Sequence, residues 1–195
     1  MIRHVDCRSF RFSSGLRVTG LDDLATVPEE PEEDGVTFEA NARIKAIAYA
    51  RATGRFSLAD DSGLEVDALD GAPGVRSARW SGVEGEREVR DAANNRKLVE
   101  SLRAVPEADR AARFVCAMCL AAPDGTVLAE TRGTFDGIVT LEPRGGDGFG
   151  YDPYLLLPDE GRTSAELSPA EKNARSHRGV ATRAMAPLIE ALERS

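Results

Sequence analysis

Cysteine, lysine and long apolar runs are all scarce in this 195-residue chain. Three cysteines are too few, and odd in number, so a disulfide-stapled secreted scaffold is excluded. No apolar run approaches the roughly 18 residues that a membrane helix needs, and the N-terminus shows no apolar core of the signal-peptide type. We therefore expect a cytoplasmic protein that has no membrane partner.

An excess of positive charge is also missing. The chain has 33 acidic and 25 basic residues, which gives a net charge of −8, so we expect no nucleic-acid partner. A hydrophobic content of 42% excludes a disordered chain. The length suits one core or two small lobes that share one, and we predict a single domain over residues 1–195.

Helical and strand-like patterns are interspersed along the chain, which predicts an α/β fold with a mixed sheet flanked by helices. Capping residues and periodicity predict helices over 37–53 and 86–104, and a bent helix that runs from Ser168 toward the C-terminus. Apolar or alternating runs predict strands over 56–59, 64–68, 113–122, 126–131, 133–141 and 154–157.

Two adjacent carboxylates follow the first apolar run, in Asp60-Asp61-Ser62-Gly63. Carboxylates at a strand end suit Mg²⁺, which takes one or two protein oxygens and completes its shell with phosphates and water. Glu32 and Glu33, in an acidic loop before a helix, could supply another ligand. An Asx turn or a helix cap would use the same residues equally well.

Two later segments could bind an anionic, flat ligand. The loop 144–152 combines glycines with Phe149 and Tyr151, and residues 172–178 gather cations and an imidazole at a predicted helix start. The alternatives are a loose surface loop and a solvated basic face. Cys116 and Cys119 have C-x-x-C spacing, but in a strand they point to opposite faces, which predicts small core residues. The chain contains no G-x-x-x-x-G-K-[ST] motif, which excludes a P-loop.

Taken in order, these segments resemble the inosine triphosphate pyrophosphatase family, which hydrolyses non-standard purine nucleotides. The resemblance covers about nine-tenths of the chain, from about Leu21 onward. The matching segments are Gly35–Ala42 with Lys45, Leu58–Leu64, Gly71–Val75, Ser77–Arg79, Gly148–Pro153, Glu171–Asn173 and Ser176–Arg178.

This resemblance implies an elongated α/β fold in which two lobes flank a central cleft, and a homodimer. It implies Mg²⁺-dependent hydrolysis of dITP, ITP or XTP to the monophosphate and pyrophosphate. Carried over by position, Asp61 would bind the metal and act as the base, and Glu32 would be a second metal ligand. Residues expected to contact the purine nucleoside triphosphate are Lys45, Ser62, Phe149, Gly150, Tyr151, Asp152, Lys172, His177 and Arg178.

The N-terminal segment 1–20 departs from this family. The family carries a T/S-x-N-x-x-K motif near its start, whose donors hold the triphosphate, but this chain has no Asn or Lys before Asn41. A misread start of the coding region and genuine divergence would both produce this difference. Three hypotheses remain: an active pyrophosphatase, a weak or inactive nucleotide-binding relative, and a hydrolase of another nucleotide that uses the same carboxylates.

Overall fold

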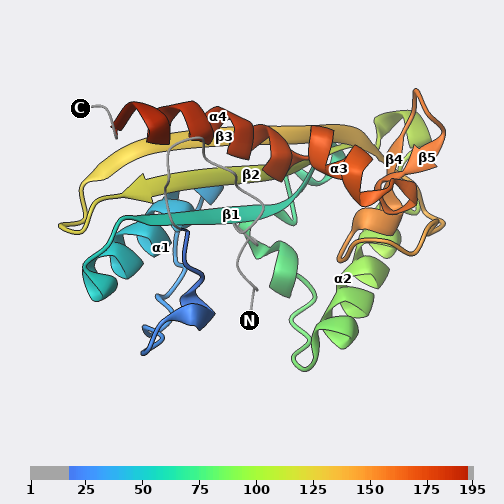
Figure 1. Ribbon diagram of the computed structural model, residues 1–195. Coiled ribbons are helices and arrows are strands. Elements are labelled where there is room, and N and C mark those ends of the chain that lie inside the picture. The colour runs from blue at the N-terminus through green and yellow to red at the C-terminus, as the bar shows by residue number, and fades with distance from the viewer. Residues whose placement is uncertain (1–17, 193–195) are drawn as a thin grey trace. The chain divides into compact units, whose positions relative to one another are not determined.

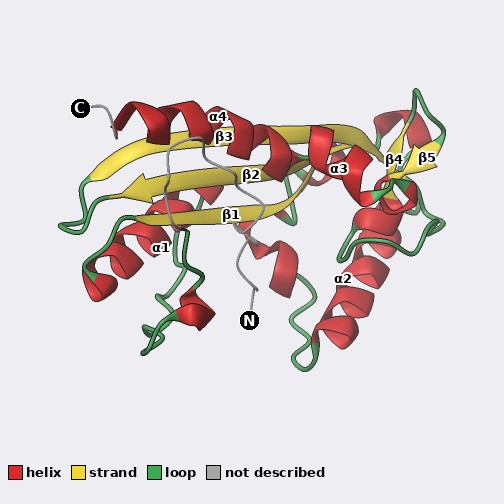
Figure 2. Ribbon diagram, in the orientation of Figure 1, coloured by secondary structure: helices red, strands yellow, loops and turns green. Residues whose placement is uncertain are grey.

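The computed structural model describes residues 18–192, so most of the atypical segment 1–20 lies outside the described part. The helices are α1 (Phe38–Thr53), α2 (Arg87–Leu102), α3 (Pro169–Arg175) and α4 (His177–Leu192). The strands are β1 (Ser57–Val66), β2 (Ala111–Ala121), β3 (Val127–Val139), β4 (Leu155–Leu157) and β5 (Arg162–Thr163). Figure 1 shows these elements along the chain, and Figure 2 separates helices from strands.

One five-stranded sheet has the order β1-β2-β3-β4-β5, and the pairs β3–β4 and β4–β5 are antiparallel. The predicted α/β class is therefore confirmed. The chain divides into two compact units: unit 1 takes its described residues from Met1–Asp61, Ala117–Arg132 and Ala181–Ser195, and unit 2 comprises Ser62–Cys116 and Gly133–Val180. No helix within residues 18–192 is long and apolar enough to cross a bilayer.

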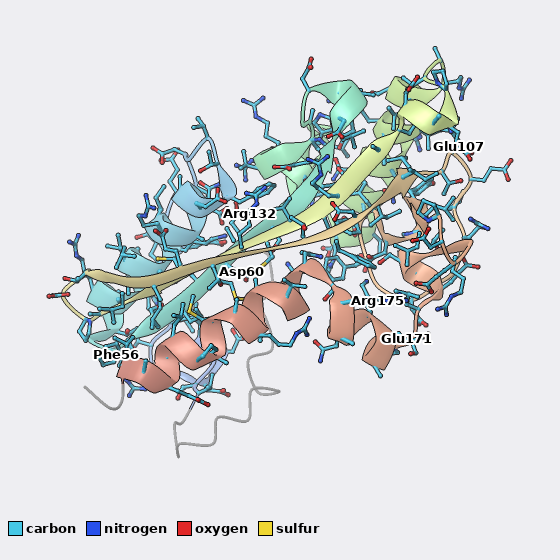
Figure 3. All side chains as sticks on the ribbon, turned by 90° about the horizontal axis from the view of Figure 1, so that it is seen from above. Phe56, Asp60, Glu107, Arg132, Glu171 and Arg175 are labelled. Atoms are coloured by element: carbon cyan, nitrogen blue, oxygen red, sulfur yellow. The ribbon has the colours of Figure 1, made fainter. Side chains whose placement is uncertain are left out.

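In unit 1, α1 and the C-terminal part of α4 lie on opposite sides of the strands (Figures 1 and 2). Alternation along β3 explains this sandwich, because neighbouring residues of a strand point to opposite faces. Glu130 accepts hydrogen bonds from Arg43 of α1, whereas the hydroxyl of Thr131 donates to the carbonyl of Ala181 in α4. Arg132, labelled in Figure 3, points again to the α1 side and pairs with Glu39.

The ends of α1 follow the capping rules that the sequence indicated. Thr37 accepts a hydrogen bond from the amide of Ala40, and Gly54 ends the helix in the left-handed conformation with φ of 65°. The helix therefore starts and ends within one residue of its prediction, which fixes the face that it turns toward β1.

Unit 2 has its own apolar core, formed where α2 and the sheet meet. Its members are Leu64, Val66, Leu98, Leu102, Ala112, Phe114, Phe135, Val139, Tyr151, Leu155, Leu157 and Leu167. The capping box of α3 is present, with Ser168 and Glu171 satisfying each other's backbone amides. Ser176 interrupts the helix as predicted, so α3 and α4 are separate. Glu171 and Arg175 lie on α3 (Figure 3).

Four strand predictions were wrong in their boundaries, because they merge pairwise into two strands. The predicted strands 126–131 and 133–141 form one strand, β3, and the predicted strands 56–59 and 64–68 form one strand, β1. Asp60-Asp61-Ser62-Gly63 therefore lies inside β1 and not in a turn after it. Pairing of β1 with β2 holds the backbone extended through Gly63, so tertiary structure overrides the local turn preference. Cys116 and Cys119 are buried in β2, which confirms them as core residues.

Candidate functional site

Asp61 is the most buried carboxylate among the described residues of unit 1, with a relative exposure of 5%. Its side chain points toward α1, where Asn41 and Lys45 stand four residues apart on one face. The amide Nδ2 of Asn41 donates to Oδ2 of Asp61 at 3.1 Å, and Nζ of Lys45 donates to Oδ1 at 3.2 Å. Both oxygens of the carboxylate thus have a donor from α1.

Lys45 holds a second carboxylate as well. Its Nζ lies 3.1 Å from Oε1 of Glu33, and both side chains are about nine-tenths buried. Glu32, the residue that the resemblance pointed to, is exposed. The carbonyl oxygen of the Asn41 side chain accepts from the amide of Gly35, which fixes the end of the acidic loop over α1. The structure therefore places Glu33 against Lys45, and Glu32 as the second metal ligand stays a prediction.

Opposing influences act on the protonation of Asp61. Burial raises the pKa of its carboxyl, and the negative charge of Glu33 raises it further. The ammonium of Lys45 and the hydrogen bond from Asn41 lower this pKa, because both stabilise the carboxylate. A carboxyl held between such influences can accept a proton in a reaction.

The donor set of unit 1 fits a hard divalent cation only in part. Glu33 and Asp61 supply carboxylates against one ammonium, which shows that a positive charge is accommodated between them. No group of three or more His, Cys, Asp or Glu side chains gathers for a metal within residues 18–192. Two carboxylates suit Mg²⁺, which draws its remaining ligands from phosphates and water, and would not suit a metal caged by protein alone.

Unit 2 contains the predicted Gly-rich loop, and Asp152 organises it. Oδ2 of Asp152 accepts from the amide of Phe149 at 2.8 Å and pairs with Nζ of Lys172 at 2.6 Å, while Oδ1 accepts from the hydroxyl of Ser164 at 2.8 Å. The residue is 3% exposed. Its three partners lie in different elements, so Asp152 ties the loop to α3 and to the segment that precedes it.

Phe149 presents a half-exposed ring in this loop, surrounded by cations. The charged groups of Arg87, Arg178 and Lys172 lie 4.3, 5.5 and 5.8 Å from the ring centre. Such a ring can stack on a flat ligand, and the cations around it favour an anionic one. Beside it, Tyr151 is buried and its hydroxyl donates to the carbonyl of Ser77 at 2.9 Å, so that hydroxyl is already engaged within the protein.

His177 lies at the start of α4 and is almost completely buried. Its ring stacks on Phe114 with 5.1 Å between centres. Burial, with the positive charges of Arg178 and Lys172, holds the pKa of His177 well below its usual range, so the imidazole is neutral at pH 7. Its Nδ1 has no hydrogen-bond partner within residues 18–192. A buried polar atom without a protein partner is uncommon in folded proteins.

The predicted site residues thus fall into two groups. Unit 1 brings together Lys45 and Asp61, and leaves Glu32 apart from them. Unit 2 brings together its predicted residues from Phe149 to Asp152 with Lys172, and His177 and Arg178 follow at the start of α4. Ser62 directly follows Asp61 on β1 and is the first residue of unit 2.

Sequence reasoning gave α2 no role in this loop. The helix contacts Gly150 through Asp91 and Asn95, and Phe149 through Arg87. The only available signal was their spacing of four residues on a polar helix, and that spacing alone names no partner.

Comparisons with known proteins identify relatives over most of the chain. The sequence profile of the Ham1 family matches residues 7–188. The dITP/XTP pyrophosphatase of Mycolicibacterium paratuberculosis is 52% identical over 184 residues, which is 93% of this chain and 86% of that protein. The dITP/XTP pyrophosphatase of Nocardia farcinica is 51% identical over 180 residues, 92% of this chain and 84% of that protein.

Solved structures give the same result. A HAM1 protein from Coxiella burnetii has a TM-score of 0.76 at 42% identity, with 84% of this chain and 81% of that chain covered. A nucleoside-triphosphatase and dITP/XTP pyrophosphatase from Mycobacterium abscessus has a TM-score of 0.73 at 44% identity, covering 91% of this chain and 87% of that chain. With a family profile that matches nearly its whole length, the chain belongs to the Ham1 family.

Proposed function

We propose that this protein hydrolyses the non-standard purine nucleoside triphosphates dITP, ITP and XTP to the monophosphate and pyrophosphate in a Mg²⁺-dependent reaction. The observation that carries the proposal is the buried group of Asp61, Glu33 and Lys45, in which two carboxylates share one ammonium. The dITP/XTP pyrophosphatases that are about 50% identical to this chain support it.

In this proposal Asp61 and Glu33 would hold Mg²⁺, and the bound metal would offset phosphate charge and position the reacting group. Asp61 takes the proton of the attacking water, and the donors Asn41 and Lys45 keep its carboxylate oriented for that task. Lys45 also meets the phosphates. The bond between the α- and β-phosphates is then cleaved by a single oriented water.

The purine is assigned to the residues of unit 2. Phe149 stacks on the base, and the neutral His177 and the cationic Arg178 face its edge. Donors that meet a 6-keto oxygen favour hypoxanthine and xanthine over adenine, whose 6-amino group is itself a donor. By the same resemblance, Gly150, Tyr151 and Asp152 shape the pocket, Ser62 touches the substrate, and Lys172 completes nucleotide binding.

Release of pyrophosphate tests the proposal. Purified protein is given ITP, XTP, dITP, GTP or ATP, each with Mg²⁺ and with EDTA in place of the metal. We expect release from ITP, XTP and dITP that requires Mg²⁺. Equal rates with ATP would overturn the purine assignment, and no release from any of the three would overturn the activity.

The departure at the N-terminus favours one second candidate. Residues 1–20 hold no T/S-x-N-x-x-K motif, so the chain would bind nucleotide with little turnover if nothing replaces those phosphate donors. Binding of ITP without pyrophosphate release identifies that case. The resemblance further extends the proposal to a homodimer in the cytoplasm, and sedimentation of the purified protein tests the dimer.

A further inference from the structure

One face of α2 contacts the Gly-rich loop at three points. Asp91 accepts from the amide of Gly150 at 3.1 Å, and Asn95 donates to the carbonyl of the same residue at 3.0 Å. Arg87 lies one turn before Asp91, with its guanidinium over the ring of Phe149. Residues spaced by four share a helix face, so this side of α2 holds the loop where Phe149 is presented.

Arg87 differs from the other cations around Phe149. Its guanidinium carbon lies 4.3 Å from the ring centre, nearer than Arg178 at 5.5 Å or Lys172 at 5.8 Å. The guanidinium therefore lies over the aromatic face, within the range of a cation–π interaction. Its side chain is 47% exposed, and its Nε lies 3.6 Å from Oδ2 of Asp91, an ion pair between residues four apart on the helix.

The position over Phe149 is therefore occupied by a guanidinium, a planar group that itself stacks well on flat rings. A purine that takes this position must displace the guanidinium by about one stacking distance. The tether to Asp91 keeps Arg87 beside the loop while it moves. The displaced guanidinium can then lie on the outer face of the base, so that the base is held between an aromatic ring and a cation.

We propose that Arg87 is a substrate-contacting residue, whose guanidinium covers Phe149 in the free protein and stacks on the outer face of the purine in the complex. This inference rests on the proposed function, because it needs a base on Phe149. Stacking does not read the substituents at the base edge, so Arg87 strengthens binding of hypoxanthine and xanthine by the same factor. It contributes affinity and leaves the choice among purines to other groups.

The test compares Arg87→Ala, Arg87→Lys and Arg87→Tyr with the wild type. We expect Arg87→Ala to raise KM for ITP and XTP equally, about fivefold to tenfold, with kcat nearly unchanged. Arg87→Lys keeps the positive charge but lacks the planar guanidinium, so the KM of this variant should also rise. Arg87→Tyr restores a flat partner without charge, so its KM should fall back toward the wild-type value. Arg96→Ala removes an exposed arginine from the same helix and serves as the control.

Two ligands separate a contact with the base from one with the phosphates. Arg87→Ala should lower the affinity for IMP, measured by calorimetric titration, and leave inhibition by inorganic tripolyphosphate unchanged. Weaker inhibition by tripolyphosphate with unchanged affinity for IMP would overturn the proposal. So would an Arg87→Ala variant with the wild-type KM and the wild-type affinity for IMP. The proposed activity is judged separately, by pyrophosphate release in the wild type, so its failure would not be mistaken for failure at Arg87.

Discussion

The ammonium of Lys45 lies 3.2 Å from Oδ1 of Asp61, and both side chains are buried. A charge that is taken out of water is stable only when a partner and hydrogen bonds replace the solvent. Lys45 meets this need for two carboxylates at once, because Glu33 lies 3.1 Å from the same nitrogen. The stability of this part of unit 1 therefore depends on Lys45 as much as its proposed chemistry does.

Lys45→Met should destabilise the protein by about 3–5 kcal/mol, because Asp61 and Glu33 are left buried without a counter-charge. Urea unfolding followed by circular dichroism measures the loss. Adding Asp61→Asn to Lys45→Met removes one of the two buried carboxylates that lack a counter-charge, so the double variant should be more stable than Lys45→Met alone. If Lys45→Met unfolds at the wild-type urea concentration, the ion pairs do not hold the fold.

Asp61→Asn should reduce pyrophosphate release by about 10² to 10⁴ fold, which is the usual contribution of a general base. The amide keeps one oxygen that can still accept from Lys45 or Asn41, so the variant should fold. Asp60→Asn is the matched control, because strand alternation directs Asp60 to the opposite face of β1. A loss as large in Asp60→Asn as in Asp61→Asn would contradict the assignment of the base.

The adjacent residues Glu32 and Glu33 offer a direct comparison of the second carboxylate. Only Glu33 is buried against Lys45, so Glu33→Gln should raise the Mg²⁺ concentration required for half-maximal activity more than Glu32→Gln does. Titration of activity with Mg²⁺ at saturating ITP measures this. The reverse order would restore Glu32 as the ligand.

Local signals in the sequence predicted the helix ends well. Thr37 marks the start of α1 and Gly54 marks its end. Ser168 and Glu171 form the capping box at the start of α3. These ends were predictable because capping depends on residues within one turn of the helix. The face shared by Asn41 and Lys45 was also readable from spacing, and it turned out to carry both donors to Asp61.

Features that depend on distant parts of the chain were not readable. Gly63 suggested a turn, yet pairing with β2 keeps β1 extended through it. The position of the acidic loop over α1 could not be predicted to within one residue. The sequence therefore did not indicate that Glu33, and not Glu32, lies next to Lys45. The contact of Asp91 with Gly150 joins residues 59 positions apart, and no local pattern on α2 indicated it.

The side chains of Asp152 and Lys172 lie close to the backbone at Gly148, because glycine has no side chain there. Replacing Gly148 should therefore lower the stability of the protein. Gly148 has φ of +87°, and a Cβ there would overlap Oδ2 of Asp152 and come within 2.7 Å of Nζ of Lys172. Gly148→Ala should therefore destabilise the protein by about 1–3 kcal/mol from backbone strain and should weaken IMP binding. Urea unfolding and calorimetric titration measure the two effects.

Gly146 is the matched control for this substitution, because it lies in the same loop and a Cβ there would meet nothing within 4 Å. Gly146→Ala should unfold and bind IMP as the wild type does. Loss of IMP affinity with unchanged stability in Gly148→Ala would still place the ion pair of Asp152 and Lys172 at the ligand. Wild-type behaviour of both alanine variants would show that the loop tolerates another arrangement, and that Asp152 does not fix the position of Phe149.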